Sequence, residues 1–116
     1  MKREQRLRKP ADFQRVREAA DRSWAHPLLV LYAAPNDHGH TRVGITVGKR
    51  VAKSAVKRNV IRRRIREAIR LRYTRIRPGY DLVCIARNAS LRATWPQLRE
   101  AVDSVIQRAG LDVLPS

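Results

Sequence analysis

The stretch from Lys49 to Arg77 constrains the fold most, because it combines dense positive charge with regularly spaced apolar residues. It reads KRVAKSAVKRNVIRRRIREAIRLRYTRIR and holds 13 of the chain's 26 lysines and arginines against a single acid, Glu67. Its apolar residues at helical spacing are Ile61, Ile65, Ala68 and Ile69. Because this period places them on one side of a helix, we predict a helix with one buried face, with Ser54 as its N-cap and Pro78 beyond its end.

The neighbouring face of this predicted helix is basic. An arc about 100° wide would hold Asn59, Arg62, Arg63, Arg66 and Arg70. Like charges four residues apart repel by roughly 0.2–0.5 kcal/mol per pair, so this row does not stabilise an isolated helix. A solvated basic face is the alternative interpretation. The density of Arg, whose planar fork suits phosphate, and the lack of acids at pairing positions favour phosphate binding.

Three short motifs around this helix resemble the signature of the bacterial ribonuclease P protein component. They are Val47-Gly48-Lys49-Arg50, then Arg58-Asn59-Val60-Ile61-Arg62-Arg63, then Arg66-Glu67. Val60 stands where that family usually has a second Arg, so one guanidinium contact is missing from the pattern. The resemblance covers nearly the whole chain. It implies the protein subunit of a ribonucleoprotein that removes the 5′ leader of precursor tRNA.

Two RNA-binding surfaces are implied by the resemblance. The surface for the catalytic RNA would comprise Lys49, Arg50, Lys53, Arg58, Asn59, Arg62, Arg63, Arg66, Arg70 and Arg87. The cleft for the single-stranded leader would comprise Phe13, Val16, Arg17 and Tyr32, with Arg15 as a flanking cation. From the residues alone Phe13 is interpreted as a core anchor, and Tyr32 fits a core position as well as a cleft position. These alternatives remain open.

Apolar runs elsewhere predict a small mixed domain spanning residues 1–116. We expect helices at about 10–20 and 95–109, strands at 28–34, 41–48 and 80–87, and a further short strand near 23–26. The strands at 28–34 and 41–48 are expected to form an antiparallel hairpin. Both faces of 28–34 are apolar, which predicts a sheet covered on both sides. This order is typical of an α/β sandwich of the α+β class, and the resemblance implies a four-stranded sheet with a left-handed strand-helix-strand crossover.

Composition argues against several other functions. The net charge of +16 favours a polyanionic partner. No apolar run approaches the 18 or so residues of a membrane span, and Met1 is followed by charged residues, which predicts a cytoplasmic location. Cys84 lies alone in an apolar run and is interpreted as a small core residue. Neither a metal-ligand cluster nor a catalytic constellation is recognisable, so no metal site is predicted on the protein. The resemblance likewise implies that the RNA subunit cuts and holds most of the Mg²⁺.

Two other classes of function remain as alternatives. One is a structural RNA-binding protein of ribosomal type without a role in tRNA processing. The other is a basic amphipathic module for DNA or for a membrane surface. The predicted basic arc includes Asn59 and has no Trp or Phe opposite, which argues against a membrane. We therefore expect the catalytic RNA and the precursor tRNA leader as partners, and neither a membrane nor a small-molecule substrate.

Overall fold

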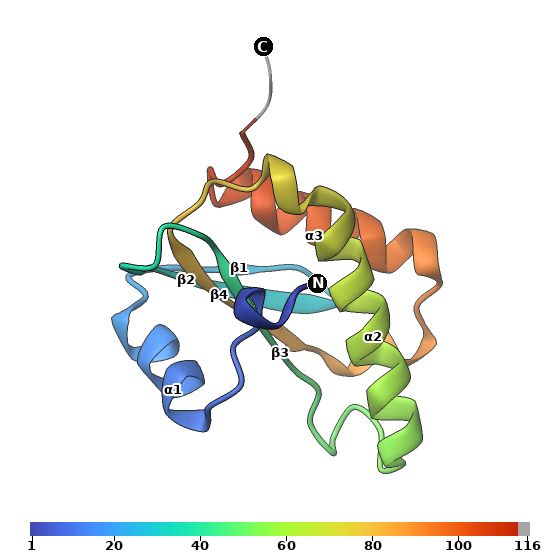
Figure 1. The fold of residues 1–116 in the computed structure, drawn as a ribbon. Helices are drawn as coiled ribbons and strands as arrows, with labels where there is room; N and C mark the ends of the chain where they lie inside the picture. The colour runs from blue at the N-terminus through green and yellow to red at the C-terminus, as the bar shows by residue number, and fades with distance from the viewer. Residues whose placement is uncertain (114–116) are drawn as a thin grey trace.

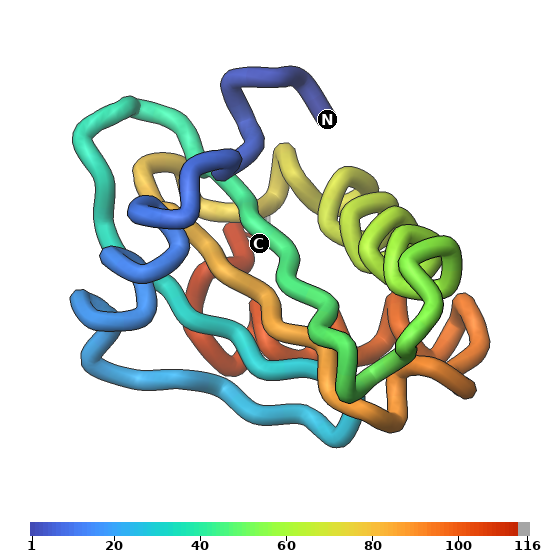
Figure 2. The backbone as a smooth tube through the Cα atoms, turned by 90° about the horizontal axis from the view of Figure 1, so that it is seen from below, coloured from blue at the N-terminus to red at the C-terminus, as the bar shows by residue number. Residues whose placement is uncertain are grey.

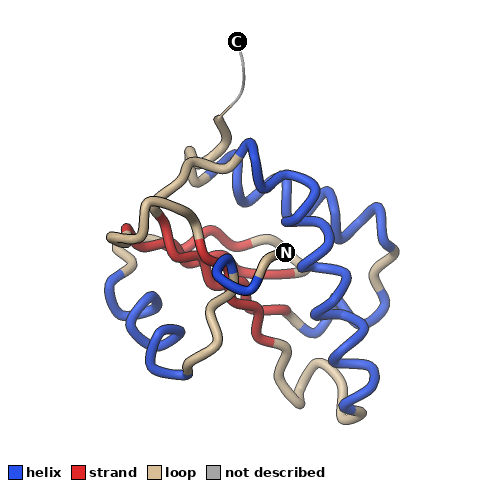
Figure 3. The backbone as a smooth tube through the Cα atoms, in the orientation of Figure 1, coloured by secondary structure: helices blue, strands red, loops and turns tan. Residues whose placement is uncertain are grey.

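The computed structural model describes residues 1–113 as a four-stranded sheet with helices on both faces (Figure 1). Its helices are α1 (Pro10–Ala19), α2 (Ala55–Arg72) and α3 (Trp95–Arg108), with short 3₁₀ helices η1 (Arg3–Gln5), η2 (Tyr73–Arg75) and η3 (Asn88–Arg92). Its strands are β1 (Ser23–Ala25), β2 (Leu29–Pro35), β3 (Arg42–Thr46) and β4 (Tyr80–Ala86). The helix α1 lies on one side of the sheet and α2 and α3 lie on the other (Figure 3). The predicted α+β class and four-stranded sheet are confirmed, including the short strand near residues 23–26.

The predicted hairpin is wrong, because β2 and β3 are not neighbours. The strand order is β1-β2-β4-β3, with β4 antiparallel to β2 and parallel to β3. Figure 2 shows β3 (green) running beside β4 (orange). Five of the seven residues of β4 are buried, on both faces of the strand, and such a strand belongs in the interior of a sheet. The chain therefore crosses from β3 through α2 to the adjacent parallel strand β4, and the left hand of this crossover stays a prediction.

Alternation along the strands divides the core into two clusters, one on each face of the sheet. The larger cluster lies under α2 and α3 and includes Leu29, Leu31, Leu82 and Cys84. The smaller cluster lies under α1 and consists of Leu7, Val16, Ala34 and Val83. The prediction of a sheet covered on both faces is confirmed. Burial also raises the pKa of the Cys84 thiol to about 12, which agrees with its predicted role as a core residue.

The helix α2 begins and packs as the sequence predicts. The Ser54 side chain accepts a hydrogen bond from the backbone N–H of Lys57 at 3.3 Å, so Ser54 is the N-cap. The buried residues of α2 are Ile61, Ile65, Ala68, Ile69 and Arg72. The first four were predicted. Arg72 was not, and its guanidinium is buried because it lies 2.9 Å from the carboxylate of Asp103 and 2.6 Å from that of Asp112.

None of the helices described for residues 1–113 is both long and apolar enough to span a lipid bilayer.

Candidate nucleic-acid interface

The exposed side of α2 carries three arginines, Arg62, Arg63 and Arg66, without a carboxylate partner among residues 1–113. Arg63 is exposed, whereas Arg62 and Arg66 are half-buried. The Arg62 guanidinium donates a hydrogen bond to the side-chain oxygen of Asn59 at 2.6 Å. Within residues 1–113 these three arginines form no ion pair. The predicted basic face is therefore present and leaves its charge available to a polyanion.

The arginines of this face repel one another in the free protein. Partial burial, together with the nearby charges of Arg6 and Arg62, lowers the pKa of Arg66. A lowered pKa means that the cationic form is destabilised, and a phosphate placed among the three guanidinium groups would relieve that repulsion. Arg6 belongs to the N-terminal segment, which is attached to β3 by a hydrogen bond from Leu7 N to Val43 O at 2.9 Å. Arg6 was not predicted for this face, because the sequence near the N-terminus gives no indication of where its basic residues lie in space.

Two other predicted cations of α2 already have partners. The Arg58 guanidinium donates hydrogen bonds to the carbonyl oxygens of Ala52 and Lys53 at 2.9 and 2.7 Å, and so fixes the loop that precedes α2. Arg70 pairs with Glu67 at 2.5 Å. Because both side chains of that pair are about half exposed, it contributes little stability and can open for a phosphate.

The remaining predicted cations lie at one edge of the sheet. They are Lys49, Arg50, Lys53 and Arg87, and all four are exposed. The first three follow β3 and Arg87 follows β4. Since these strands are parallel and pair Thr46 with Ile85, their C-terminal ends reach the same edge. The fold thus brings Arg87 to the edge of the sheet where the loop into α2 begins.

A groove of about 360 Å³ separates α1 from β3 and α2, and we refer to it as the α1 groove. It is lined by Arg8, Pro10, Phe13, Arg17, Ile45, Thr46, Val47 and Arg62. Phe13 and Arg17 were predicted for the leader cleft, and Arg62 was predicted for the catalytic RNA. The two predicted surfaces therefore meet at Arg62.

Phe13 is half-buried and serves both the core and the groove. One side of it packs on the small cluster under α1, and its ring lies close over Gly44 of β3, where a Cβ atom would stand only 2.5 Å from the ring. Val16 is fully buried, so the prediction that it lines the cleft needs correction. Val16 belongs to the buried cluster against which Phe13 packs. Tyr32 packs on the same cluster and stays partly exposed, without lining the α1 groove.

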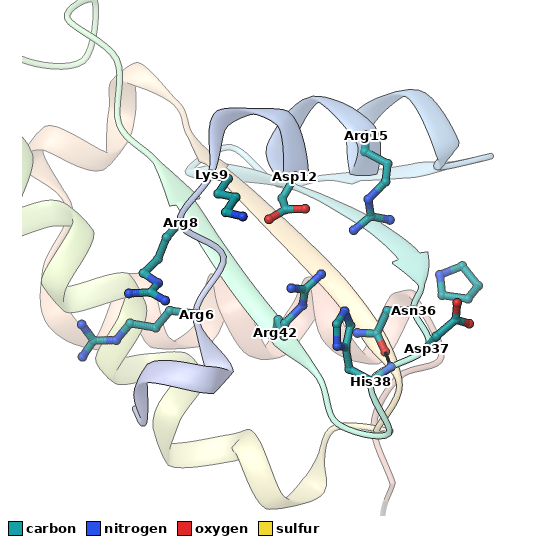
Figure 4. A pocket seen from close by; sticks show the side chains of 10 residues that line it. Arg6, Arg8, Lys9, Asp12, Arg15, Asn36, Asp37, His38 and Arg42 are labelled. Atoms are coloured by element: carbon teal, nitrogen blue, oxygen red, sulfur yellow. Dashed lines mark hydrogen bonds between the residues drawn. The ribbon is translucent and has the colours of Figure 1, made fainter.

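A larger basic pocket of about 630 Å³ opens on the other side of the N-terminal segment. Arg6 and Arg8 approach it from that segment, Asp12 and Arg15 extend from α1, and Arg42 lies between them (Figure 4). Arg15 was predicted to flank the leader, and that assignment needs correction because its guanidinium binds the buried carboxylate of Asp81. Arg8 lines both this pocket and the α1 groove, so positive charge continues from one to the other.

Comparison with known proteins identifies the family. The sequence profile of the Ribonuclease P family matches residues 1–110. The chain belongs to the ribonuclease P protein family. A ribonuclease P protein component from Herpetosiphon aurantiacus is 49% identical over 111 residues, covering 96% of this chain and 89% of the relative. The component from Clostridioides difficile is 39% identical over 108 residues, covering 92% of this chain and 93% of the relative.

Solved structures of ribonuclease P proteins share this fold. The Staphylococcus aureus RNase P protein superposes with a TM-score of 0.85 at 33% identity, covering 93% of this chain and 97% of that one. The Thermotoga maritima RNase P protein gives a TM-score of 0.79 at 27% identity, covering 89% and 96%. The resemblance found in the sequence is confirmed. The chain is an RNA-binding protein component of ribonuclease P, an endoribonuclease complex of tRNA processing, and the ribosomal and membrane alternatives are set aside.

Proposed function

We propose that the two surfaces hold different RNAs of the ribonuclease P reaction. The basic face of α2 docks on the catalytic RNA, and the α1 groove receives the 5′ leader of precursor tRNA. The observation that carries this proposal is the position of Arg62. It belongs to the row of arginines that form no ion pair within residues 1–113, and it also lines the groove that contains Phe13. A leader in the groove would consequently lie beside the docked catalytic RNA.

In this arrangement the protein contributes in two ways: it binds the leader of the substrate, and its positive charge screens the repulsion between the two RNAs. A base stacked on an aromatic ring contributes roughly 1–3 kcal/mol, so the half-exposed ring of Phe13 would raise the affinity for substrates that carry a leader. The surrounding arginines reduce the repulsion between the phosphates of the catalytic RNA and those of the substrate. Both effects help the RNA hold its substrate and its Mg²⁺ ions.

The hydrolytic chemistry belongs to the catalytic RNA in this proposal. Mg²⁺ prefers free carboxylate oxygens, but Asp81, Asp103 and Asp112 are each bound to arginine. In the part of the chain that the structure describes, His, Cys, Asp and Glu side chains nowhere gather in threes. We therefore propose that the catalytic RNA holds the Mg²⁺ ions of the reaction.

Reconstitution tests this function directly. We expect the protein to restore leader cleavage by the catalytic RNA of the same organism at a Mg²⁺ concentration where the RNA alone is inactive. Gel analysis of 5′-labelled precursor tRNA measures the product, and polylysine at equal charge serves as the control for unspecific screening. Equal rescue by polylysine, or no rescue by the protein, would argue against the proposal.

Replacing Phe13 with Ala should weaken binding of leader-bearing precursor more than binding of mature tRNA. Loss of one stacked base predicts a difference of roughly 1–3 kcal/mol, or about five- to 150-fold in Kd. Titration of the reconstituted holoenzyme with both RNAs measures this difference. Equal losses for the two RNAs would show that Phe13 is only a core anchor.

Gly44→Ala provides a second variant that keeps the ring but moves it. The new Cβ would stand 2.5 Å from the Phe13 ring and 3.1 Å from Cβ of Leu7, so the ring must shift. We expect leader discrimination to fall in this variant as well. Circular dichroism of both variants serves as the control for folding.

A further inference from the structure

The other flank of α2 carries a second groove in which apolar side chains are exposed. It separates α2 from η3 and has a volume of about 450 Å³; we refer to it as the α2–η3 groove. Its lining includes Val56, Lys57, Val60, Arg64, Leu91 and Arg92. Val56 is 72% exposed and Leu91 is 38% exposed. Apolar side chains gathered in a hollow of the surface often mark a binding site.

The fold itself holds these apolar side chains outward. In η3, Ser90 is buried and its hydroxyl donates a hydrogen bond to the carbonyl of Arg87 at 2.7 Å, while Ala93 is buried two residues after Leu91. Ser90 and Ala93 are three residues apart and lie on one side of this turn, so Leu91 lies on another side and keeps part of its side chain exposed. Val56 and Val60 are four residues apart at the start of α2 and so lie on one side of the helix. The groove is thus preformed by two fixed elements.

The rim of the α2–η3 groove is positively charged. Lys57, Arg64 and Arg92 are exposed, and within residues 1–113 their side chains form no ion pair. None of the described residues that line the groove is acidic. An occupant that complements this surface must combine a flat apolar part with negative charges on both sides of it. An unpaired RNA nucleotide has this chemistry, since its base is flat and its two phosphates are anionic.

We propose that the α2–η3 groove binds an unstacked base of the catalytic RNA. The base lies against Val56, Val60 and Leu91, and the cations of the rim contact the flanking phosphates. This inference rests on the proposed docking of α2 on the catalytic RNA and extends the contact to the second flank of the helix. It also gives a role to Val60, where the sequence departs from the family's motif, because an apolar contact there takes the place of a guanidinium contact.

The salt dependence of binding separates the apolar contact from the phosphate contacts. Leu91→Ala and Val60→Thr should each raise the Kd for the catalytic RNA roughly fivefold, since each removes apolar contact with the base. The slope of log Kd against log salt should not change. Arg64→Gln should instead make the slope shallower by about 0.7–0.9, the value of one phosphate contact.

Leu71→Ala is the matched control for these variants. Leu71 is an exposed apolar residue of the same helix, 44% exposed, and lies outside the groove. Eleven residues separate it from Val60, or about 16 Å along the helix axis. Its replacement should leave both the Kd and the slope unchanged.

Base-specific probing with dimethyl sulfate provides a second readout. We expect at least one base of the catalytic RNA to be protected by the wild-type protein and reactive with Leu91→Ala, while the backbone footprint of α2 persists. Unchanged Kd and base protection in both groove variants would overturn the inference. If Arg62→Ala still weakened binding in that case, the proposed function would stand, whereas failure of the wild-type protein to bind this RNA would reject both. Self-association that depends on Leu91, without an effect on RNA binding, would assign the groove to a second copy of the chain and also overturn the inference.

Discussion

Replacing Asp81 with Ala is expected to lower the free energy of unfolding by about 3–5 kcal/mol, the cost of breaking a buried ion pair by removing one partner. Asp81 is completely buried. Its carboxylate accepts hydrogen bonds from Arg42 at 2.9 and 2.7 Å, from Asn36 at 2.8 Å and from Arg15. Most of this loss comes from Arg42. Its side chain is only 17% exposed, so its charge would remain largely buried without a partner. Urea unfolding followed by circular dichroism measures the loss.

The acid sensitivity of the protein should depend on the same carboxylate. Burial alone would raise the pKa of Asp81, but the hydrogen bonds from Arg42, Asn36 and Arg15 outweigh burial and lower it below its ordinary value. A group with a lowered pKa in the folded state contributes its full stability above its unfolded pKa of about 3.9. That contribution is lost as the pH falls through the lower, folded pKa.

Asp81→Asn should therefore flatten the dependence of stability on pH below about pH 4. Glu67→Gln is the control, because the pKa of Glu67 is also lowered, by its hydrogen bond from Arg70, but the pair lies at the surface. Unfolding curves at a series of acidic pH values compare the two variants with the wild type. Identical acid profiles for wild type and Asp81→Asn would show that this carboxylate is not the group that titrates.

The elements of the fold could be predicted from local periodicity, but the order of the strands could not. The apolar spacing of Ile61, Ile65 and Ile69 indicates one buried helix face wherever that helix packs. Strand pairing instead depends on contacts between segments that lie far apart in the sequence, which local periodicity does not report. β4 lies between β2 and β3, and the short connection from β2 to β3 suggested a hairpin that does not form.

A similar limit applies to the candidate site. Helical spacing separates basic from apolar positions, and it placed Arg62, Arg63 and Arg66 on an accessible face. The same spacing does not show whether an arginine pairs with a carboxylate from a distant part of the chain. Arg15 meets Asp81 across 66 residues and Arg72 meets Asp112 across 40. Both arginines therefore have structural roles that only the tertiary fold reveals.

Replacing Arg62 and Arg66 together with Ala should make the salt dependence of binding to the catalytic RNA shallower by about 1.4–1.8, the value of two phosphate contacts. Each charge-assisted hydrogen bond contributes roughly 1.5–3 kcal/mol, so the Kd at low salt should rise about 100-fold or more. Filter binding across a salt series measures both quantities.

The double variant of Arg62 and Arg66 should bind RNA more weakly, but the free protein should not lose stability. Partial burial and the nearby charges of Arg6 and Arg62 lower the pKa of Arg66, so the cationic form of Arg66 is disfavoured before RNA binds. Ala also favours the helix, so we expect the Tm of the double variant to equal or exceed that of the wild type. A residue needed for packing would instead lower both Tm and affinity.

Arg99→Ala combined with Arg108→Ala is the matched control, because it removes the same charge from exposed positions of α3. If net charge alone governed binding, both double variants would change the slope equally. An effect confined to Arg62 and Arg66 would instead locate the contact on α2, since counterions are released only where phosphates meet the protein. Equal slopes in the two double variants would thus contradict the assignment of this face to the catalytic RNA.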